Sequence, residues 1–280
     1  MREFQGRTAV VTGAASGIGL ALCRRFAAAG MRLVMADIEK PALQEAAEAL
    51  RGGGTEVLDM VTDVSNPAQV DELARAATDA FGPVNVLCNN AGVASGGLVS
   101  ELSIEDWRWV LGVNLFGVVH GLHSFLPGML AHGQEAHVVN TASLAGLVSP
   151  PLMSPYSASK FAVVAISESL YHELNMTGAK VKVSVLCPGW VNTRIHEASR
   201  NRPAGLGGDQ AREVDESRMQ LMAQVISSGL PPEQVAEKVF EAINEERLYV
   251  ITHPDMLAGV EARMRSILDQ TNPVLTGFFA

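Results

Sequence analysis

The chain has 280 residues, of which 48% are apolar, so it can bury a substantial core in one large domain or two small ones. Its 21 basic and 30 acidic side chains give a net charge of −9, which excludes a cationic surface suited to nucleic acid or anionic lipid. The charged fraction of 18% argues against disorder, and by this pattern no apolar run reaches the length of a membrane span. The polar start at residues 1–6 has no signal-peptide pattern, so we expect a soluble cytoplasmic protein.

Short apolar runs alternate with longer segments of helical period, a pattern typical of a parallel sheet with helices on both faces. The expected strands span 8–12, 32–36, 55–60, 84–88, 136–141, 181–186 and 248–251. The expected helices span 17–29, 41–50, 67–81, 104–131, 156–176, 233–245 and 255–270. We expect one doubly wound α/β domain over residues 1–280. Its segment 189–232 is a lid over the substrate site or an irregular surface excursion.

A glycine-rich turn, T-G-A-A-S-G-I-G, follows the first strand and contains Gly13, Gly17 and Gly19. Glycines between a strand and a helix let the backbone approach a pyrophosphate, and the helix N-terminus supplies N–H groups and partial positive charge. Because glycine also occurs in ordinary turns, the order strand, turn, helix, strand is what gives the motif weight. The pattern predicts a dinucleotide site.

An acidic residue, Asp37, lies at the end of the second expected strand. A carboxylate at this position accepts hydrogen bonds from an adenosine ribose and repels a 2′-phosphate. Ser16 occupies the turn where a basic residue could otherwise neutralise that phosphate. The sequence therefore favours NAD over NADP. The alternative is that Asp37 is a surface residue that caps the next helix.

A tyrosine and a lysine, Tyr156 and Lys160, lie four residues apart in Y-S-A-S-K and so share one helix face. A free tyrosine has a pKa of about 10, but an ammonium and an oxidised nicotinamide nearby both favour the phenolate, so Tyr156 can act as acid or base. Such a pair alone is more often a surface contact. Ser143 changes this interpretation, because it directly follows the fifth strand, at the sheet edge where ligands bind.

These motifs resemble the short-chain dehydrogenase/reductase family. The resemblance rests on T-G-A-A-S-G-I-G at 12–19, N-N-A-G at 89–92, Asn114, Ser143, Y-S-A-S-K at 156–160 and P-G-W-V-N-T at 188–193. It extends from about residue 6 to 195, with the motifs in the family's order. It implies a seven-stranded Rossmann-type domain, which usually forms dimers or tetramers through the helices after strands four and five.

The resemblance also implies roles for individual residues. Tyr156 would be the acid or base, Lys160 would lower its pKa and bind the nicotinamide ribose, Ser143 would hold the reacting oxygen, and Asn114 would hold a water that connects Lys160 to solvent. A distorted helix or a structural water is the alternative for Asn114, a polar residue among apolar neighbours. The expected NAD-binding residues are Gly13, Ser16, Gly17, Ile18, Gly19, Asp37, Asp63, Val64, Asn90, Ala91, Gly92, Tyr156, Lys160, Pro188, Gly189, Val191 and Thr193.

The expected activity is therefore NAD-dependent interconversion of a secondary alcohol and a ketone, without a metal. The apolar residues near the expected site favour a hydrophobic or aromatic substrate: Leu144, Leu147, Val148, Leu152, Met153, Trp190, Met219 and Met222. Two alternatives are a dinucleotide-binding sensor without turnover and a dehydratase or epimerase on a related scaffold. The first would be expected to lack the Tyr, Lys and Ser, and the second usually has a larger C-terminal domain. The apolar tail with Phe278 and Phe279 is expected to dock on a neighbouring subunit.

Overall fold

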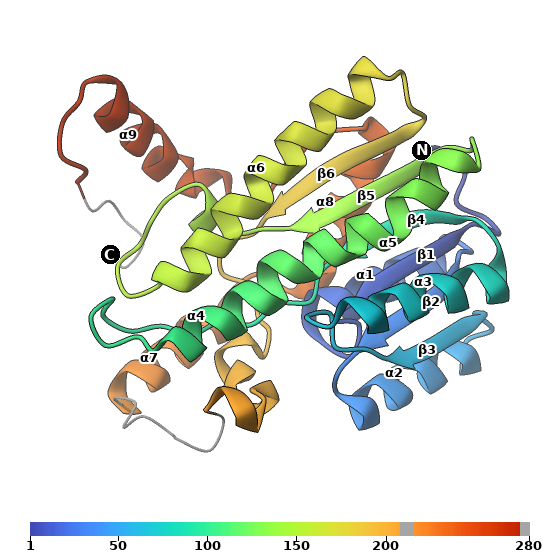
Figure 1. The fold of residues 1–280 in the computed structure, drawn as a ribbon, viewed down its shortest axis with the longest axis horizontal. Coiled ribbons are helices and arrows are strands. Elements are labelled where there is room, and N and C mark those ends of the chain that lie inside the picture. Colours follow the sequence, from blue (N-terminus) through green and yellow to red (C-terminus); the bar gives the residue numbers. More distant parts are fainter. Residues whose placement is uncertain (208–215, 275–280) are drawn as a thin grey trace.

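Seven parallel strands form one sheet in the order β3-β2-β1-β4-β5-β6-β7, which confirms the predicted fold (Figure 1). The computed structural model describes residues 1–207 and 216–274. The strands are β1 (Thr8–Thr12), β2 (Arg32–Asp37), β3 (Val57–Val61), β4 (Val84–Asn89), β5 (Ala136–Thr141), β6 (Val181–Cys187) and β7 (Tyr249–Ile251). The chain moves outward in opposite directions from β1 and β4, so the loops after these two neighbouring strands form a crevice at the carboxyl edge of the sheet.

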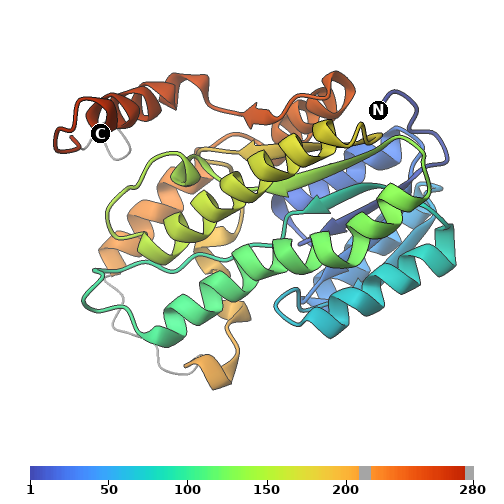
Figure 2. The same ribbon diagram turned by 45° about the horizontal axis from the view of Figure 1, so that its top comes forward.

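The helices form two layers, one on each face of the sheet (Figure 2). One layer contains α1 (Gly17–Ala28), α2 (Lys40–Gly52) and α8 (Pro232–Glu245), which bury Leu22, Phe26, Leu43 and Ile243 against the strands. The other contains α3 (Pro67–Phe81), α5 (Gly117–Ala131) and α6 (Ser154–Met176), with Leu73, Phe125 and Leu170 in its core. Because helices cover both faces of the sheet, every residue of β1, β4 and β5 is buried.

The expected helix 104–131 is three consecutive pieces rather than one regular helix. It comprises α4 (Ile104–Leu111), a π-helical turn (Gly112–Phe116) and α5. The distortion expected as one explanation of Asn114 is therefore present, and π-turns often lie at functional sites. The whole stretch is also long and apolar enough to cross a membrane, contrary to the sequence-based expectation. In this fold, however, α5 packs on β4 and α3, as a core helix does.

The segment 189–232 contains helical structure that the sequence pattern did not predict. It holds 3-10 turns at Ile195–Asn201 and Ala204–Leu206, followed by α7 (Glu216–Ser227). At its base, Val191 and Leu230 pair as a parallel β-bridge, and the amide of Asn192 donates to the carbonyl of Leu230 over 2.9 Å. The two ends of the segment 189–232 therefore lie side by side at Val191 and Leu230.

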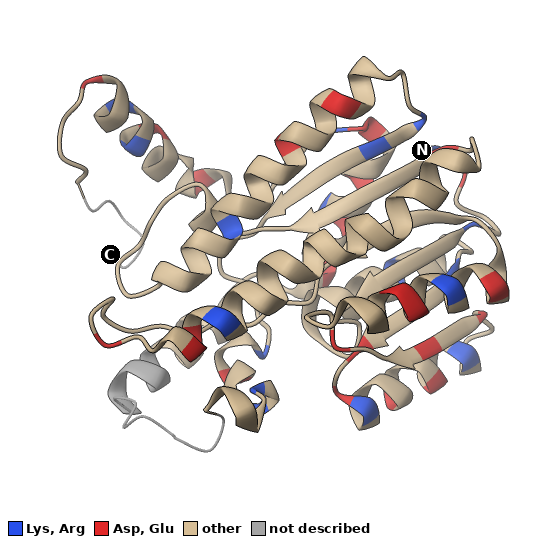
Figure 3. Cartoon of the chain, viewed as in Figure 1, with Lys and Arg blue, Asp and Glu red and all other residues tan. Residues whose placement is uncertain are grey.

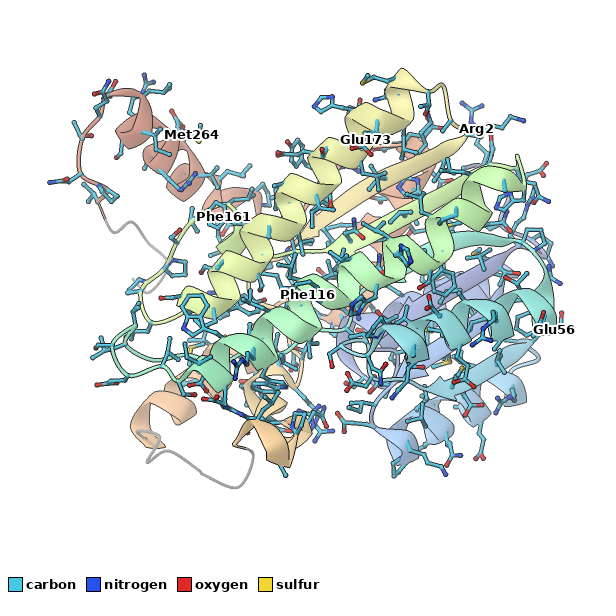
Figure 4. The ribbon with its side chains drawn as sticks, viewed as in Figure 1. Arg2, Glu56, Phe116, Phe161, Glu173 and Met264 are labelled. Atoms are coloured by element: carbon cyan, nitrogen blue, oxygen red, sulfur yellow. The ribbon has the colours of Figure 1, made fainter. Side chains whose placement is uncertain are left out.

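The last helix, α9 (Leu257–Leu268), projects from the body of the domain (Figures 1 and 2). It follows a 3-10 turn at Pro254–Met256, so the expected single helix 255–270 is shorter. Its Arg263 guanidinium lies 4.8 Å from the ring centroid of Phe161, a residue of α6 that faces this helix in Figure 4. Phe278 and Phe279 lie outside the described residues.

Candidate active site

A cavity of about 290 Å³ lies at the carboxyl edge of the sheet and gathers almost all of the predicted site residues. The predicted residues that line it are Gly13, Ser16, Gly17, Ile18, Asp37, Asp63, Val64, Asn90, Ala91, Gly92, Ser143, Tyr156, Lys160, Pro188, Gly189, Val191 and Thr193. Gly19 and Asn114 are buried behind this lining. Residues at the carboxyl ends of β1 to β6 thus meet around one space with Tyr156 and Lys160 from the start of α6.

The glycine turn holds the start of α1 close to β1. Gly13 has a φ of +67°, and a Cβ there would lie 2.9 Å from the Cα of Ala91. Among the described residues, α1 begins at Gly17 without a side-chain cap and without an acidic residue in its first turn. Its first N–H groups and their partial positive charge therefore face the cavity without competition, as a bound pyrophosphate requires.

Gly19 has a packing role at the start of α1, and its expected contact with the cofactor stays a prediction. A Cβ at Gly19 would lie 2.0 Å from the backbone carbonyl oxygen of Gly13, which no side-chain movement can relieve. We expect Gly19→Ala to lower the free energy of unfolding by about 2 kcal/mol or more and to weaken dinucleotide binding. Thermal melts and NADH titration measure both effects. Gly52→Ala is the control, because a Cβ there meets nothing within 4 Å; equal behaviour of the two variants would contradict this account.

Asp37 lies beside the glycine turn with its carboxylate held by two backbone amides. Oδ2 accepts from the amide of Ala15 over 2.9 Å, and Oδ1 accepts from the amide of Glu39 over 3.0 Å. Burial raises the pKa of Asp37, while these hydrogen bonds lower it. The carboxylate is thus fixed and partly desolvated, a state in which a ribose hydroxyl pair would be a favourable partner and a phosphate an unfavourable one.

The loop N-N-A-G at 89–92 is attached to the end of β1. The amides of Asn90 and Ala91 both donate to Thr12 Oγ1, over 3.0 and 3.1 Å. Asn90 Nδ2 donates to the carbonyl of Thr12 over 3.0 Å, and Thr141 Oγ1 donates to Asn90 Oδ1 over 3.3 Å. Asn90 therefore joins the ends of β1, β4 and β5 into one floor beneath the cavity.

Ser143, Tyr156 and Lys160 are all buried at this edge, with at most 9% of each residue exposed. Burial raises the pKa of Tyr156, and a hydrogen bond with Ser143 lowers it. Lys160 Nζ donates to the carbonyl of Thr141 over 2.8 Å and lies 5.6 Å from the Tyr156 ring centroid. Burial lowers the pKa of Lys160 to about 8. In the chain alone, burial thus favours the neutral hydroxyl of Tyr156 over the phenolate.

Asn114 lies on the π-helical turn, and both its Oδ1 and its Nδ2 atoms form hydrogen bonds. Oδ1 accepts from the amide of Val93 over 2.8 Å, and Nδ2 donates to the carbonyl of Val93 and to Ser159 Oγ over 2.9 and 3.1 Å. A Cβ on Gly92 would lie 3.5 Å from Asn114 Oδ1 and 3.7 Å from Lys160 Nζ. Asn114 is thus near Lys160, and its amide fixes the loop after β4. The Oδ1 atom can accept a second hydrogen bond, so the water expected to connect Lys160 to solvent stays a prediction.

Two arginines of the segment 195–202 attach it to both sides of the cavity, which sequence reasoning missed. Arg200 donates to Glu39 Oε1 over 2.6 Å at the end of β2. Arg202 donates to Asp106 Oδ1 of α4 over 2.6 Å, and its guanidinium lies 5.3 Å from the Trp109 ring centroid. Such pairs between distant segments leave no periodic pattern, so the sequence gives no signal for them.

Loss of the Arg202 contact is expected to loosen this segment, because it removes the Arg202 guanidinium from the Asp106 carboxylate, which is 4% exposed. We expect Arg202→Met to raise the rate of limited proteolysis within 195–207 roughly tenfold and to increase the substrate KM. Arg51→Met is the control, since Arg51 pairs with Asp59 at the surface. Unchanged cleavage in Arg202→Met would show that the ion pair does not hold the segment.

The apolar side of the cavity only partly matches the residues expected there. Met153, Trp190 and Met222 line it, whereas Leu144, Leu147, Val148 and Leu152 do not, because the turn after Ser143 directs them elsewhere. The Met219 side chain lies outside the described residues. The remaining apolar lining comes from the loop after β4, α4, the 195–206 turns and α7: Val93, Ala94, Trp109, Ile195, Ala198, Leu206 and Ile226.

The fold and the cavity together define a dinucleotide-binding α/β oxidoreductase. The open α1 N-terminus, the glycine turn without room for a Cβ, and the fixed Asp37 carboxylate fit the pyrophosphate and adenosine ribose of NAD. The chain belongs to the short-chain dehydrogenase/reductase family: the family described as short chain dehydrogenase matches residues 7–204.

Relatives extend over almost the whole chain. The CLA biosynthesis dehydrogenase/reductase of Lactiplantibacillus plantarum is 34% identical over 98% of this chain and 97% of its own length. The C alpha-dehydrogenase of Sphingobium sp. is also 34% identical, over 98% of this chain and 89% of that protein. The crystal structure of a short chain dehydrogenase/reductase from Burkholderia phymatum in complex with NAD is 47% identical, with a TM-score of 0.96 over 99% of both chains.

Proposed function

We propose that the chain is an NAD-dependent oxidoreductase that interconverts a secondary alcohol and a ketone. The observation that carries this proposal is the meeting of Ser143, Tyr156 and Lys160 on the same cavity as the glycine turn and Asp37. The NAD complex of the Burkholderia phymatum relative supports the choice of cofactor. The relatives named dehydrogenases support the reaction class.

Bound NAD would accept or supply two electrons with a hydrogen at its nicotinamide C4. Gly13, Ser16, Gly17 and Ile18 would hold its pyrophosphate, and Pro188, Gly189, Val191 and Thr193 its nicotinamide end. Ser143 Oγ would donate a hydrogen bond to the substrate oxygen and orient it toward Tyr156 Oη. Tyr156 would take the alcohol proton during oxidation and return it during reduction.

Lys160 would act on Tyr156 through its charge. Its ammonium lies within the same buried site, so it favours the phenolate more strongly than it would in water. A cationic nicotinamide would add a second positive charge there, and the two together would lower the Tyr156 pKa that burial raises in the chain alone. Tyr156 would thus become an effective base only when the oxidised cofactor is bound.

The substrate is proposed to be hydrophobic or aromatic. The cavity has an apolar wall that includes Val93, Trp109, Met153, Trp190, Ile195, Leu206 and Ile226. Two tryptophans and a methionine provide a broad apolar surface that adapts to planar or branched groups. The segment 189–232 supplies much of this wall and is proposed to be the substrate lid.

A screen of secondary alcohols with NAD, followed by reduced nicotinamide absorbance at 340 nm, tests the proposed function. Aryl and branched alkyl carbinols are expected to react, while short polar alcohols react weakly. An enzyme that converts a hydroxylated substrate without reducing NAD would instead support the dehydratase or epimerase alternative. Tight NADH binding without turnover of any carbinol or ketone would support the sensor alternative.

We also propose a cytoplasmic dimer or tetramer. Residues 112–131, which form the π-helical turn and α5, include no Lys, Arg, Asp or Glu (Figure 3). Phe116, Val119 and Leu130 are exposed there by 49%, 36% and 45%, and Phe116 points outward in Figure 4. An uncharged face with exposed apolar side chains favours covering by a second copy.

A further inference from the structure

The Pro188–Gly189 peptide, at the proposed nicotinamide end of the cavity, is held by hydrogen bonds on both of its sides. Its carbonyl oxygen accepts from the amide of Leu144 over 2.9 Å and from Ser143 Oγ over 3.4 Å. Its N–H, on Gly189, donates to His253 Nδ1 over 3.1 Å and to Thr252 Oγ1 over 3.3 Å. One peptide plane therefore connects Ser143 to a histidine that follows β7.

The side chains of His253 and Met256 also pack against Gly189 of this peptide. A Cβ on Gly189 would lie 2.8 Å from His253 Cγ and 2.9 Å from Met256 Sδ. The imidazole and the thioether thus lie directly on the Gly189 Cα, and only glycine fits beneath them. If the His253 ring is removed, the peptide loses the nearer of its two amide acceptors and its packing support together, and only the 3.3 Å contact with Thr252 Oγ1 remains.

We propose that His253 is a positioning residue for the active site, which orients the Pro188–Gly189 peptide and through it Ser143 and the nicotinamide pocket. This inference rests on the proposed function. His253 is a separate residue from the family motifs that predicted the site, and it lies in the T-H-P stretch at 252–254. The residue does not line the cavity, so its effect must pass through Gly189.

The protonation state of His253 decides whether this contact can form. The Gly189 N–H needs a lone pair on Nδ1, and Thr252 Oγ1, 2.7 Å from the same nitrogen, can donate its own proton to it. In the imidazolium, Nδ1 carries a proton, so the Gly189 N–H would face another donor. Protonation would therefore push the peptide away from its position.

The surroundings keep the imidazole neutral near pH 7. Burial lowers the pKa of His253 below its ordinary value of 6.5. Asp255 on the same segment and a hydrogen bond to the Trp190 backbone raise the pKa, while Lys238 of α8 lowers it. Because the folded-state pKa lies below 6.5, the contact is present at neutral pH and is lost as the pH falls through that lowered value.

The test compares His253→Ala and His253→Asn with wild type. Asparagine places an oxygen acceptor near the position of Nδ1 and does not titrate, so it should rescue the contact. In the protein without cofactor, hydrogen exchange at Gly189 is expected to be about tenfold faster in His253→Ala and close to wild type in His253→Asn. His172→Asn, at an exposed position of α6, is the matched control.

The kinetic readout uses NAD and a carbinol that wild type oxidises, from pH 5 to 8. We expect the NAD KM of His253→Ala to rise about tenfold at pH 7.5, and kcat to fall as Ser143 loses its orientation. The activity of wild type should fall below pH 6.5 as His253 is protonated, and the pH profile of His253→Asn should lack this decrease. Unchanged Gly189 exchange in His253→Ala, or the same decrease in His253→Asn, would overturn the proposal. Wild type without NAD-dependent turnover would overturn the proposed function, while Gly189 exchange would still decide whether His253 holds the peptide.

Discussion

Replacement of Tyr156 by phenylalanine is expected to lower kcat about a thousandfold, because the variant retains the ring but has no proton to exchange with the substrate oxygen. The ring is 9% exposed and packs with Trp109, Ala145 and Ala198, so phenylalanine preserves this packing. NADH affinity should therefore change by less than about threefold, a difference of under 1 kcal/mol. Steady-state kinetics and NADH titration separate the two effects.

Tyr249→Phe is the matched control for that substitution. Tyr249 lies on β7, is 44% exposed and donates to Glu168 over 2.7 Å, so its hydroxyl lies outside the cavity lining. Its removal should leave kcat unchanged. Near-normal turnover of Tyr156→Phe on a confirmed substrate would show that another group carries the proton.

Replacement of Asp37 by serine is expected to lower kcat/KM for NAD about a hundredfold and to raise the relative efficiency with NADP. The carboxylate is the expected acceptor for the two ribose hydroxyls, and hydrogen bonds to a charged group contribute more than neutral ones. Its negative charge would also repel a 2′-phosphate. Parallel kinetics with NAD and NADP measure the change in preference.

Asp37→Asn separates charge from shape in the same experiment. The amide oxygen can still accept one of the backbone hydrogen bonds from Ala15 or Glu39, so the turn should keep its conformation. Discrimination against NADP should nevertheless weaken. Asp79→Ser, an exposed acid on α3, is the control for the loss of one negative charge. If Asp37→Ser and Asp37→Asn retained the wild-type cofactor preference, Asp37 would not select the cofactor.

The sheet and most of the cavity lining were predictable because they depend on local patterns. Apolar runs of strand length, glycine stops and helical periodicity predicted all seven strands, two of them with the observed bounds. The glycine turn, Asp37 and Ser143 each follow or end a strand, and Tyr156 lies in the first turn of α6, so the topology alone brings them to one edge of the sheet. Functional residues at the ends of strands can thus be inferred without knowing any tertiary contact.

The parts that could not be predicted depend on contacts between distant segments. The segment 195–202 is held by Arg200 and Arg202, whose acidic partners are about 160 and 96 residues away. The bonding of Asn114 to Val93 follows from the π-helical turn, which no periodicity reveals. The direction of the Tyr156 pKa also required burial to be known. These features determine the substrate pocket more than the fold does.

Transfer of deuterium from a carbinol labelled at its C–H position tests the central claim most directly. With NAD and a secondary alcohol carrying one deuterium on the carbinol carbon, mass spectrometry of the reduced dinucleotide should find one deuterium per molecule and a ketone without it. Wild type should give this result and Tyr156→Phe should give it only at a rate about a thousandfold lower. Product that retains the deuterium, or deuterium released to water with NAD unchanged, would contradict the assignment as an alcohol dehydrogenase.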